Sequence, residues 1–350
     1  MIINQSQFGY LIDYYKYASF LGKEYDVTYC CWDYGNIRLQ NKDITIRYIS
    51  RHGNVLTRNM RYISESLRIY RSEHFDVVLI NYFRGCSLTS LFISKNKSIL
   101  DIRTGAINAA AWERRFRNGL LWIESLFFRQ ISIISFALGK KLRLNHRKLL
   151  ELPLGAEMLN IGSKKLSEIK LLYVGSFTLR RIEDTIYGVA RFKKDHPGIK
   201  LSYIIIGFGI EHEDEKFRSI IQELNLQKDV TVKGYIHQDL LTPYYRWATI
   251  GVSYIPITSY YNYQPPTKTY EYLQAGMPVL ATRTCAQTEI INEKNGVLIR
   301  DNPEAFADGL HSLFCRFHEF RSGTIQETVK EYTWENTYHK LRTIIENKIR

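Results

Sequence analysis

The sequence lacks the cysteine pattern of a disulfide scaffold or of a zinc site. Its five cysteines are scattered and odd in number, and no two of them have the spacing of zinc ligands. They are Cys30, Cys31, Cys86, Cys285 and Cys315. We therefore expect a reduced compartment, the cytoplasm, and no bound metal.

A long uninterrupted hydrophobic run is also missing. The most apolar stretch, residues 120–138, is broken by Glu124 and Arg129, which argues against a membrane-spanning helix. The first ten residues, MIINQSQFGY, have no charged segment followed by an apolar one, as a signal peptide would. We expect a cytoplasmic protein, either free or peripheral on the inner face of a membrane.

Acidic residues are scarce in the first part of the chain. Residues 1–150 hold 23 Lys and Arg against 11 Asp and Glu, whereas the remaining residues hold 25 and 24. A basic field of this kind attracts nucleic acid, anionic lipid or phosphorylated ligands. No helix-turn-helix, zinc-finger or RNA-binding signature is present, so we expect no nucleic-acid partner.

Short apolar runs typical of buried strands alternate with amphipathic stretches along the chain. Strands are expected at residues 2–3, 26–31, 43–50, 75–80, 98–102, 171–174, 201–206, 230–233, 250–255 and 279–281, and helices near 11–21, 59–70 and 183–194. This alternation predicts parallel sheets with helices on both faces. The rhythm restarts after the charged stretch 162–170, which predicts two doubly wound α/β domains.

Ligands of such sheets bind beyond the carboxyl ends of the strands, so the loops there are candidate sites. Gly175 follows a predicted strand and precedes Arg180 and Arg181, whose forked guanidinium groups suit phosphate oxygens. A plain strand-to-helix turn with solvent-facing arginines is the alternative. Gly207 and Gly209 follow the next strand, but the third glycine of a dinucleotide fingerprint is absent, which argues against an NAD site.

The stretch 264–282, QPPTKTYEYLQAGMPVLAT, predicts a short helix that begins after Pro266 with Thr267 as its N-cap. Gly276 and Pro278 predict its end. Lys268 in the first turn opposes the helix dipole by about 0.3–1 kcal/mol, a cost that an anion bound between them would remove. The helix start is therefore a candidate phosphate site.

Glu271 lies one turn after Lys268, on the same face of this helix. It could simply pair with Lys268. It could instead accept hydrogen bonds from two neighbouring hydroxyl groups, as a carboxylate does with a ribose diol. A phosphate site beside a diol site describes a nucleoside diphosphate.

Several motifs, taken in order, resemble the donor-binding domain of glycosyltransferase family 4, which has the GT-B fold. They are LLYVGSFTLRR, YIIIGFG, VTVKGYI, PTKTYEYLQAGMPVLAT and TEIINEKNGVLI, followed by YTWENTYHKL, which is similar to the family's closing helix. The resemblance covers residues 150–340 well. Residues 1–150 match more loosely and resemble the acceptor domains of enzymes that build bacterial surface polysaccharides.

The resemblance implies roles for individual residues. Gly175 and Arg180 or Arg181 would contact the diphosphate, with Arg181 preferred by spacing because Ser176 replaces the usual arginine. Tyr235 and Ile236 would line the nucleobase, Lys268 and Thr269 would sit near the phosphates or the sugar, and Glu271 would hold the ribose. Other residues expected to bind the nucleotide sugar are Gly207, Gly209, Pro266 and Thr267.

The sequence departs from the family pattern at Tyr263, where the first acid of the Glu-x7-Glu motif is expected. That acid faces the transferred sugar in the family, so its loss leaves the identity of the sugar open. Asn262, Tyr263 and Gln264 could supply hydrogen bonds to the sugar instead.

Candidate residues also follow the strands of the first half. Gly9, after the first strand, permits close approach by the donor or forms a tight turn. Asp101 and Arg103 could hold an acceptor or balance a phosphate, or they could form a structural ion pair. Residues 112–138 combine arginines with Trp, Leu and Phe, as in a surface helix that meets anionic lipid; a core helix with a basic end is the alternative.

We therefore expect a GT-B protein with an acceptor-binding domain (1–160), a nucleotide-sugar donor-binding domain (161–330) and a helix (331–350) that crosses back to the first domain. The expected activity is metal-independent, hexosyltransferase-like, retaining transfer from a nucleotide diphosphate sugar to a saccharide or lipid-linked acceptor. The expected catalytic residues are Asp101, Arg103, Arg181 and Lys268. The alternatives are a catalytically degenerate nucleotide-binding scaffold and a sugar-nucleotide epimerase that uses His237.

Overall fold

The chain folds into two compact units. The computed structural model describes residues 1–350 except 109, 160, 163–167, 211 and 350. One unit comprises Met1–Gly155 together with Trp334–Arg350, and the other comprises Ala156–Thr333. The sequence places the boundary between residues 160 and 161, and residue 160 and part of the charged stretch 162–170 lie outside the described residues.

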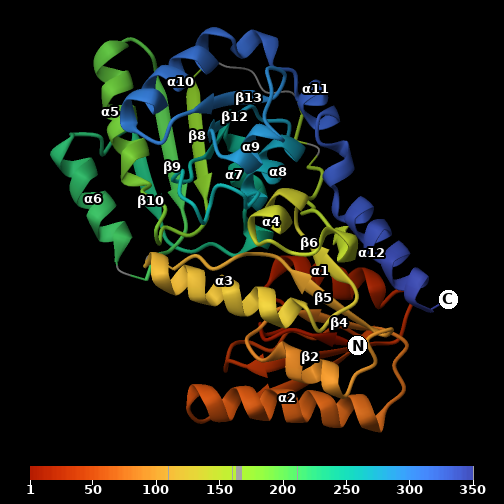
Figure 1. The fold of residues 1–350 in the computed structure, drawn as a ribbon. Coiled ribbons are helices and arrows are strands. Elements are labelled where there is room, and N and C mark those ends of the chain that lie inside the picture. Colours follow the sequence, from red (N-terminus) through yellow and green to blue (C-terminus); the bar gives the residue numbers. More distant parts are fainter. Residues whose placement is uncertain (109, 160, 163–167, 211, 350) are drawn as a thin grey trace. The chain divides into compact units, whose positions relative to one another are not determined.

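The first unit contains a parallel seven-stranded sheet in the order β3-β2-β1-β4-β5-β6-β7 (Figure 1). Its strands are β1 (Ile2–Ile3), β2 (Val27–Asp33), β3 (Ile44–Ser50), β4 (Val78–Asn81), β5 (Ser98–Ile102), β6 (Ile131–Ile133) and β7 (Leu149–Glu151). Its helices are α1 (Ile12–Leu21), α2 (Val55–Ser72), α3 (Ala111–Ser125), α4 (Phe136–Lys141) and α12 (Trp334–Ile349), with short 3-10 turns at Cys86–Leu91 and His146–Lys148.

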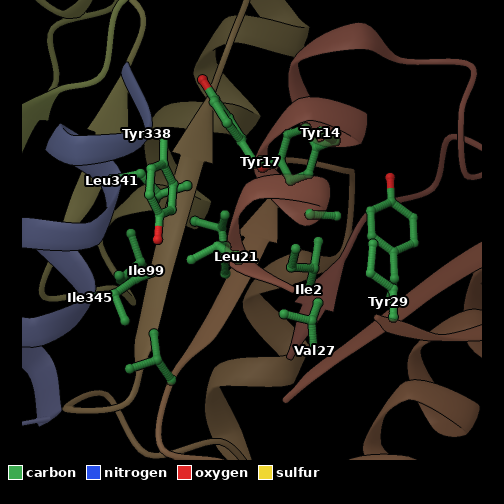
Figure 2. Packing of buried hydrophobic residues seen from close by; sticks show 14 of the residues in the cluster. Ile2, Tyr14, Tyr17, Leu21, Val27, Tyr29, Ile99, Tyr338, Leu341 and Ile345 are labelled. Atoms are coloured by element: carbon green, nitrogen blue, oxygen red, sulfur yellow. The ribbon is translucent and has the colours of Figure 1, made fainter. Parts of the chain in front are cut away.

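The core of this unit depends on α12, although that helix is about 180 residues away in sequence from the rest of the unit. Tyr338 and Leu341 of α12 lie across from Tyr17 of α1 in Figure 2. The rings of Phe20 and Tyr338 stack with centroids 5.2 Å apart. Burial of this apolar face ties the last helix to the first sheet.

The second unit contains a parallel six-stranded sheet in the order β10-β9-β8-β11-β12-β13. Its strands are β8 (Ile169–Val174), β9 (Leu201–Ile206), β10 (Val230–Lys233), β11 (Ile250–Ser253), β12 (Val279–Thr282) and β13 (Gly296–Ile299). Its helices are α5 (Glu183–Asp195), α6 (Glu213–Glu223), α7 (Thr242–Trp247), α8 (Thr267–Gln274), α9 (Cys285–Thr288), α10 (Pro303–Cys315) and α11 (Ser322–Glu327), with 3-10 turns at Gln238–Leu240, Phe317–Glu319 and Lys330–Tyr332.

The register of this sheet brings glycines together at its carboxyl edge. Val174, the last residue of β8, is paired with Ile206, the last residue of β9. Ile206 is paired in turn with Lys233, the last residue of β10. Each of these strands is followed directly by a glycine, so three glycines share one end of the sheet. This edge is the place where a doubly wound sheet receives its ligands.

The structure confirms the expected α/β class, and each expected strand corresponds to an observed one. The expectation of one surface helix over residues 112–138 is wrong. That stretch forms α3, then the short strand β6, then the start of α4. The turn between α3 and β6 contains Phe128, which is buried, so the apolar run continues into the sheet instead of along one helix. No helix among the described residues is long and apolar enough to cross a membrane.

Candidate functional site

The loops after β8 and β9 touch through their backbones. Gly175 and Gly207 have φ angles of +149° and +155°. A Cβ atom on Gly207 would lie 1.8 Å from the carbonyl oxygen of Gly175, so no side chain fits there. The amide of Gly175 donates to the carbonyl of Ile206 at 3.0 Å, which ties the two loops together. Gly209 is also crowded, because a Cβ atom there would meet the carboxylate of Glu213.

Gly175 makes room for the amine of Lys268. A Cβ atom at position 175 would lie 2.8 Å from Nζ of Lys268. The same Nζ lies 3.7 Å from the centre of the Tyr173 ring, a cation–π distance. The Tyr173 hydroxyl donates to the backbone oxygen of Ser176 at 2.7 Å, and this bond fixes the ring beneath the amine. The side chain of Lys268 is thus aimed at the end of β8.

Lys268 is also in the first turn of α8. The N-cap of α8 is Pro266, with extended backbone angles, and Thr267 is the first helical residue. The prediction that Thr267 caps the helix is therefore wrong. The end of α8 is as expected, because Gly276 has φ +69° and its amide donates to Leu273 O. No side chain caps the N-terminus, so the first-turn N–H groups and the Lys268 amine share one end of the helix.

The environment of Lys268 disfavours its charged form. Burial lowers the pKa of Lys268 well below its ordinary value, and the positive charge of Arg180 lowers it further. The carboxylate of Glu271 acts in the opposite direction. A bound anion beside Nζ would favour the charged form of Lys268 and attract it. A phosphate bound at this position would therefore supply the negative charge that favours protonated Lys268.

The structure brings Arg180, and not Arg181, to Lys268. The guanidinium carbon of Arg180 lies 3.9 Å from the centre of the Tyr261 ring. Arg181 is exposed and has the left-handed φ of +51°. Its guanidinium group pairs with Asp184 at 2.7 Å and with Asp301 at 3.7 Å. Two carboxylates thus pair with Arg181, whereas Arg180 acts on Lys268, and the expected contact of Arg181 with the diphosphate stays a prediction.

Glu271 is half-buried in α8 and is held by a tyrosine from α7. The Tyr245 hydroxyl donates to Oε2 of Glu271 at 3.0 Å. Tyr245 is buried, so the hydrogen bond fixes the orientation of the carboxylate. Sequence reasoning missed Tyr245, because it lies in a different helix and no motif links the two residues.

Thr269 is a structural residue, contrary to the expectation that it lies near the phosphates or the sugar. It is fully buried, and its hydroxyl bonds Ser253 Oγ at 2.7 Å and Gln287 Oε1 at 3.0 Å. The amide of Gln287 donates to the backbone oxygens of Ser253 and Thr282 at 3.1 and 2.9 Å. This buried network fastens α8 to β11, β12 and α9, so it fixes the position of Lys268 and Glu271.

Two exposed aromatic rings stand at the ends of β9 and β10. Phe208 is 55% exposed and Tyr235 is 63% exposed, and their rings meet edge to face with centroids 5.7 Å apart. Ile236 beside them is half-buried. The sequence predicted Tyr235 and Ile236 at a nucleobase, whereas Phe208 was missed. The pattern Gly-x-Gly directed attention to the glycines and not to the ring between them.

The loop that precedes α8 is internally bonded. Oδ1 of Asn262 accepts from the Cys285 amide at 2.8 Å, and Nε2 of Gln264 donates to Tyr260 O at 2.6 Å. Tyr263 is half-buried between them. In this conformation the side chains of Asn262 and Gln264 hold the loop itself, and their expected hydrogen bonds to the sugar stay a prediction.

Asp101 and Arg103, expected as catalytic residues, form a buried network inside the first unit. Asp101 is 0% exposed and accepts from Tyr14 OH at 2.8 Å and from Ser132 Oγ at 2.7 Å. Burial raises the pKa of Asp101. Arg103 donates to Asp13 at 3.0 Å and to Leu152 O at 2.7 Å, and Nη1 lies 3.9 Å from Asp101. Of the two alternatives raised by the sequence, this buried network fits the structural ion pair, and the catalytic role of the two residues stays a prediction.

Two further candidates have local roles. Gly9 has φ +92°, and a Cβ atom there would lie 2.3 Å from Leu39 Cδ1, so the turn and its packing require glycine. His237, the expected acid–base group of an epimerase, lies 3.2 Å from Asp239 Oδ2 through Nδ1. Among the described residues, no group of three or more His, Cys, Asp or Glu side chains could hold a metal ion.

Comparisons with known proteins agree with this architecture. Residues 168–316 match the family model described as Glycosyl transferases group 1. No curated protein matches the chain by sequence. The family match and the fold confirm the predicted resemblance to glycosyltransferase family 4.

Solved structures of similar fold extend over nearly the whole chain. Sucrose-phosphate synthase from Thermosynechococcus elongatus shares 14% identity over 95% of this chain and 91% of its own, with a TM-score of 0.73. Anabaena HepE, in complex with UDP and glucose, shares 11% identity over 99% and 98%, with a TM-score of 0.74. The lipopolysaccharide outer core galactosyltransferase WaaB, in its apo form, shares 12% identity over 99% and 98%, with a TM-score of 0.71. At these identities the similarity establishes the GT-B fold.

Proposed function

We propose, from the premise that this chain carries a group 1 glycosyltransferase domain on a GT-B fold, that it transfers a sugar from a nucleotide diphosphate sugar to a saccharide or lipid-linked saccharide acceptor. One observation carries the proposal. The Lys268 amine lies at the first turn of α8, against Gly175 and beside Arg180, where burial and the charge of Arg180 disfavour its charged form.

The diphosphate would occupy the space between the end of β8 and the start of α8. Gly175 allows its oxygens to approach the backbone, and the first-turn N–H groups of α8 can donate to them. Lys268 and Arg180 would then neutralise the charge that develops on the leaving diphosphate as the glycosidic bond breaks. We propose that transfer needs no metal ion, because these fixed positive groups can neutralise the charge of the diphosphate.

The nucleoside would lie beside the phosphates on the same carboxyl edge. Phe208 and Tyr235 offer exposed aromatic surface for stacking on a base, with Ile236 beside them. Glu271, oriented by Tyr245, would accept hydrogen bonds from the ribose hydroxyls. The structure of HepE with UDP and glucose supports this class of donor.

We assign the donor to residues 161–330 and the acceptor to residues 1–160, with residues 331–350 as a helix that completes the first domain. The basic charge of residues 1–150 suits an acceptor that carries phosphate. The fold shared with WaaB supports a role in the synthesis of surface polysaccharide. Retention at the anomeric carbon is proposed from the family resemblance alone, because Tyr263 replaces the usual acid.

The Glu271→Ala variant tests the site. We expect it to weaken binding of the nucleoside diphosphate by about 1–3 kcal/mol, because a charged hydrogen-bond acceptor is lost. Calorimetric titration with UDP and GDP measures the change. Glu215→Ala removes an exposed carboxylate of the same unit and should leave the affinity unchanged.

Equal affinities of Glu271→Ala and the parent protein for both nucleotides would remove Glu271 from the site. Nucleotide binding without transfer to any acceptor would favour the alternative of a non-catalytic scaffold. Interconversion of the donor sugar without transfer would favour the epimerase.

We also propose that α3 contacts an anionic membrane surface, where lipid-linked acceptors reside. Trp112, Phe116 and Ile123 follow the spacing of one helix face and are all exposed, the first two at 73% and 66%. Arg115 is exposed next to this stripe. An apolar stripe flanked by arginine suits the boundary between lipid headgroups and acyl chains.

The Trp112→Ser/Phe116→Ser variant should bind phosphatidylglycerol vesicles at least about 10-fold more weakly, because it lacks two large apolar side chains that would be buried in the membrane surface. Vesicle co-sedimentation measures the loss. Ile37→Ser/Leu56→Ser removes exposed apolar side chains from other parts of the same unit and serves as the matched control. Equal losses in the two variants would contradict a specific role for α3.

A further inference from the structure

The amino edge of the first sheet carries an open pocket of about 570 Å³ that the donor site does not use. Its residues come directly before β5, β6 and β7 and from the last turn of α12. The lining side chains are Asn96, Arg129, Gln130, Arg147, Lys148 and Lys348, with Leu150, Asn347 and Ile349. The pocket therefore lies at the opposite edge of this sheet from Gly9 and Arg103, which follow strand ends.

Four cationic side chains line this pocket, and no carboxylate is among the lining residues. Some exposed cations elsewhere in the unit have acidic partners, as Arg38 has Asp33 and Arg47 has Glu73. Within the described part of the chain, no ion pair involves Arg129, Arg147, Lys148 or Lys348. No described side chain therefore compensates the positive charge of the pocket through an ion pair.

Neutral contacts position these cations without cancelling their charge. Lys148 Nζ donates to Leu126 O at 3.1 Å, and Lys348 Nζ donates to Ser98 O at 3.2 Å. Arg129 donates to Asn96 Oδ1 at 2.5 Å. Burial and nearby cations lower the pKa of both lysines, Lys95 acting on Lys148 and Arg129 on Lys348. The protein holds like charges together at a cost, which a bound anion would repay.

We infer that this pocket binds a phosphate group, as in a sugar phosphate, glycerol phosphate or a phosphatidylglycerol headgroup. Arg129 and Arg147 supply forked donors for the phosphate oxygens, and Lys148 and Lys348 supply point charges. This site is separate from the proposed donor site and does not depend on it.

The test compares the parent protein with Arg129→Gln/Arg147→Gln and with Lys42→Gln/Lys140→Gln, a control that removes two exposed charges of the same unit outside the pocket. Glycerol 3-phosphate is titrated calorimetrically with UDP present in excess. UDP then occupies the donor site, so binding of the probe at that site does not contribute to the measured heat. Phosphatidylglycerol and phosphatidylcholine vesicles are compared by co-sedimentation. The pocket variant should lose about 10-fold or more in affinity for the anionic probe, because charged hydrogen bonds are removed.

The two arms distinguish the source of the phosphate. Loss of glycerol 3-phosphate binding in the pocket variant alone identifies a soluble ligand. Loss confined to phosphatidylglycerol vesicles, beyond that of the control variant, identifies a lipid headgroup. Binding of both probes that is equal in the pocket and control variants, or absent from the parent protein, would overturn the inference.

Discussion

Lys268→Met should reduce kcat/KM for sugar transfer by about 10²–10³-fold, the loss typical of removing one preorganised group from a developing charge. Methionine keeps most of the length of the side chain and removes the positive charge together with its N–H donors. Gly175 and Tyr173 would still accommodate it, so the loops at the carboxyl edge should keep their positions. Steady-state assays with a nucleotide sugar donor measure the effect.

The same variant should also change how the stability of the protein depends on pH. Because the folded-state pKa of Lys268 is lowered from 10.5, the unfolded chain binds more protons between the two pKa values. Stability of the parent protein should therefore rise with pH across that window, and Lys268→Met should lack this rise. Denaturant titrations at several pH values compare the two.

Lys194→Met, at an exposed position of α5, is the matched control and should change neither the activity nor the pH dependence. A Lys268→Met enzyme with full activity would exclude the amine from the donor site. Nucleotide binding would then depend on Glu271 and Arg180, without a contribution from Lys268.

Asp101→Ala should lower the free energy of unfolding of the first unit by about 3–5 kcal/mol. The substitution removes a buried carboxylate and leaves its buried hydrogen-bond and ion-pair partners unsatisfied. Tyr14, Ser132 and Arg103 would each lose a contact in the core. Urea unfolding followed by tryptophan fluorescence reports mainly this unit, since Trp247 is the one tryptophan in the second. Nucleotide affinity should remain that of the parent protein.

Asp76→Ala, which removes an exposed carboxylate of the same unit, should be close to neutral. An Asp101→Ala protein of unchanged stability and abolished transfer would restore the catalytic role that the sequence suggested. This comparison therefore separates a residue that shapes the protein from one that touches the substrate.

The spacing of the apolar runs predicted the fold well, and the residue types around the start of α8 predicted part of the candidate site. The strands at residues 98–102, 201–206 and 230–233 coincide with the observed ones, because each is a short β-rich run bounded by turn residues. Strands β6, β7 and β13 were missed, since runs of three or four residues carry little pattern. The cost of a lysine against a helix dipole pointed to Lys268 without any knowledge of tertiary contacts.

The errors share one cause, which is that sequence spacing does not reveal tertiary partners. Arg180 and Arg181 are adjacent, and only the positions of Tyr261, Asp184 and Asp301 decide which guanidinium group faces Lys268. Thr269 follows Lys268 directly, yet the helix turns it into the core. Parallel strands bring such partners from distant parts of the chain, and a single sequence does not show which ones meet.

The return of α12 to the first unit has a consequence for the order of events during synthesis. Residues 1–155 emerge from the ribosome before the whole of residues 156–333, but α12 supplies Trp334, Leu341 and Ile345 to their core. The early segment must therefore wait, with an apolar face uncovered, while the second unit is made. Nascent chains that stop before residue 334 should depend on chaperones, whereas the second unit, which is continuous in sequence, can complete its own sheet first.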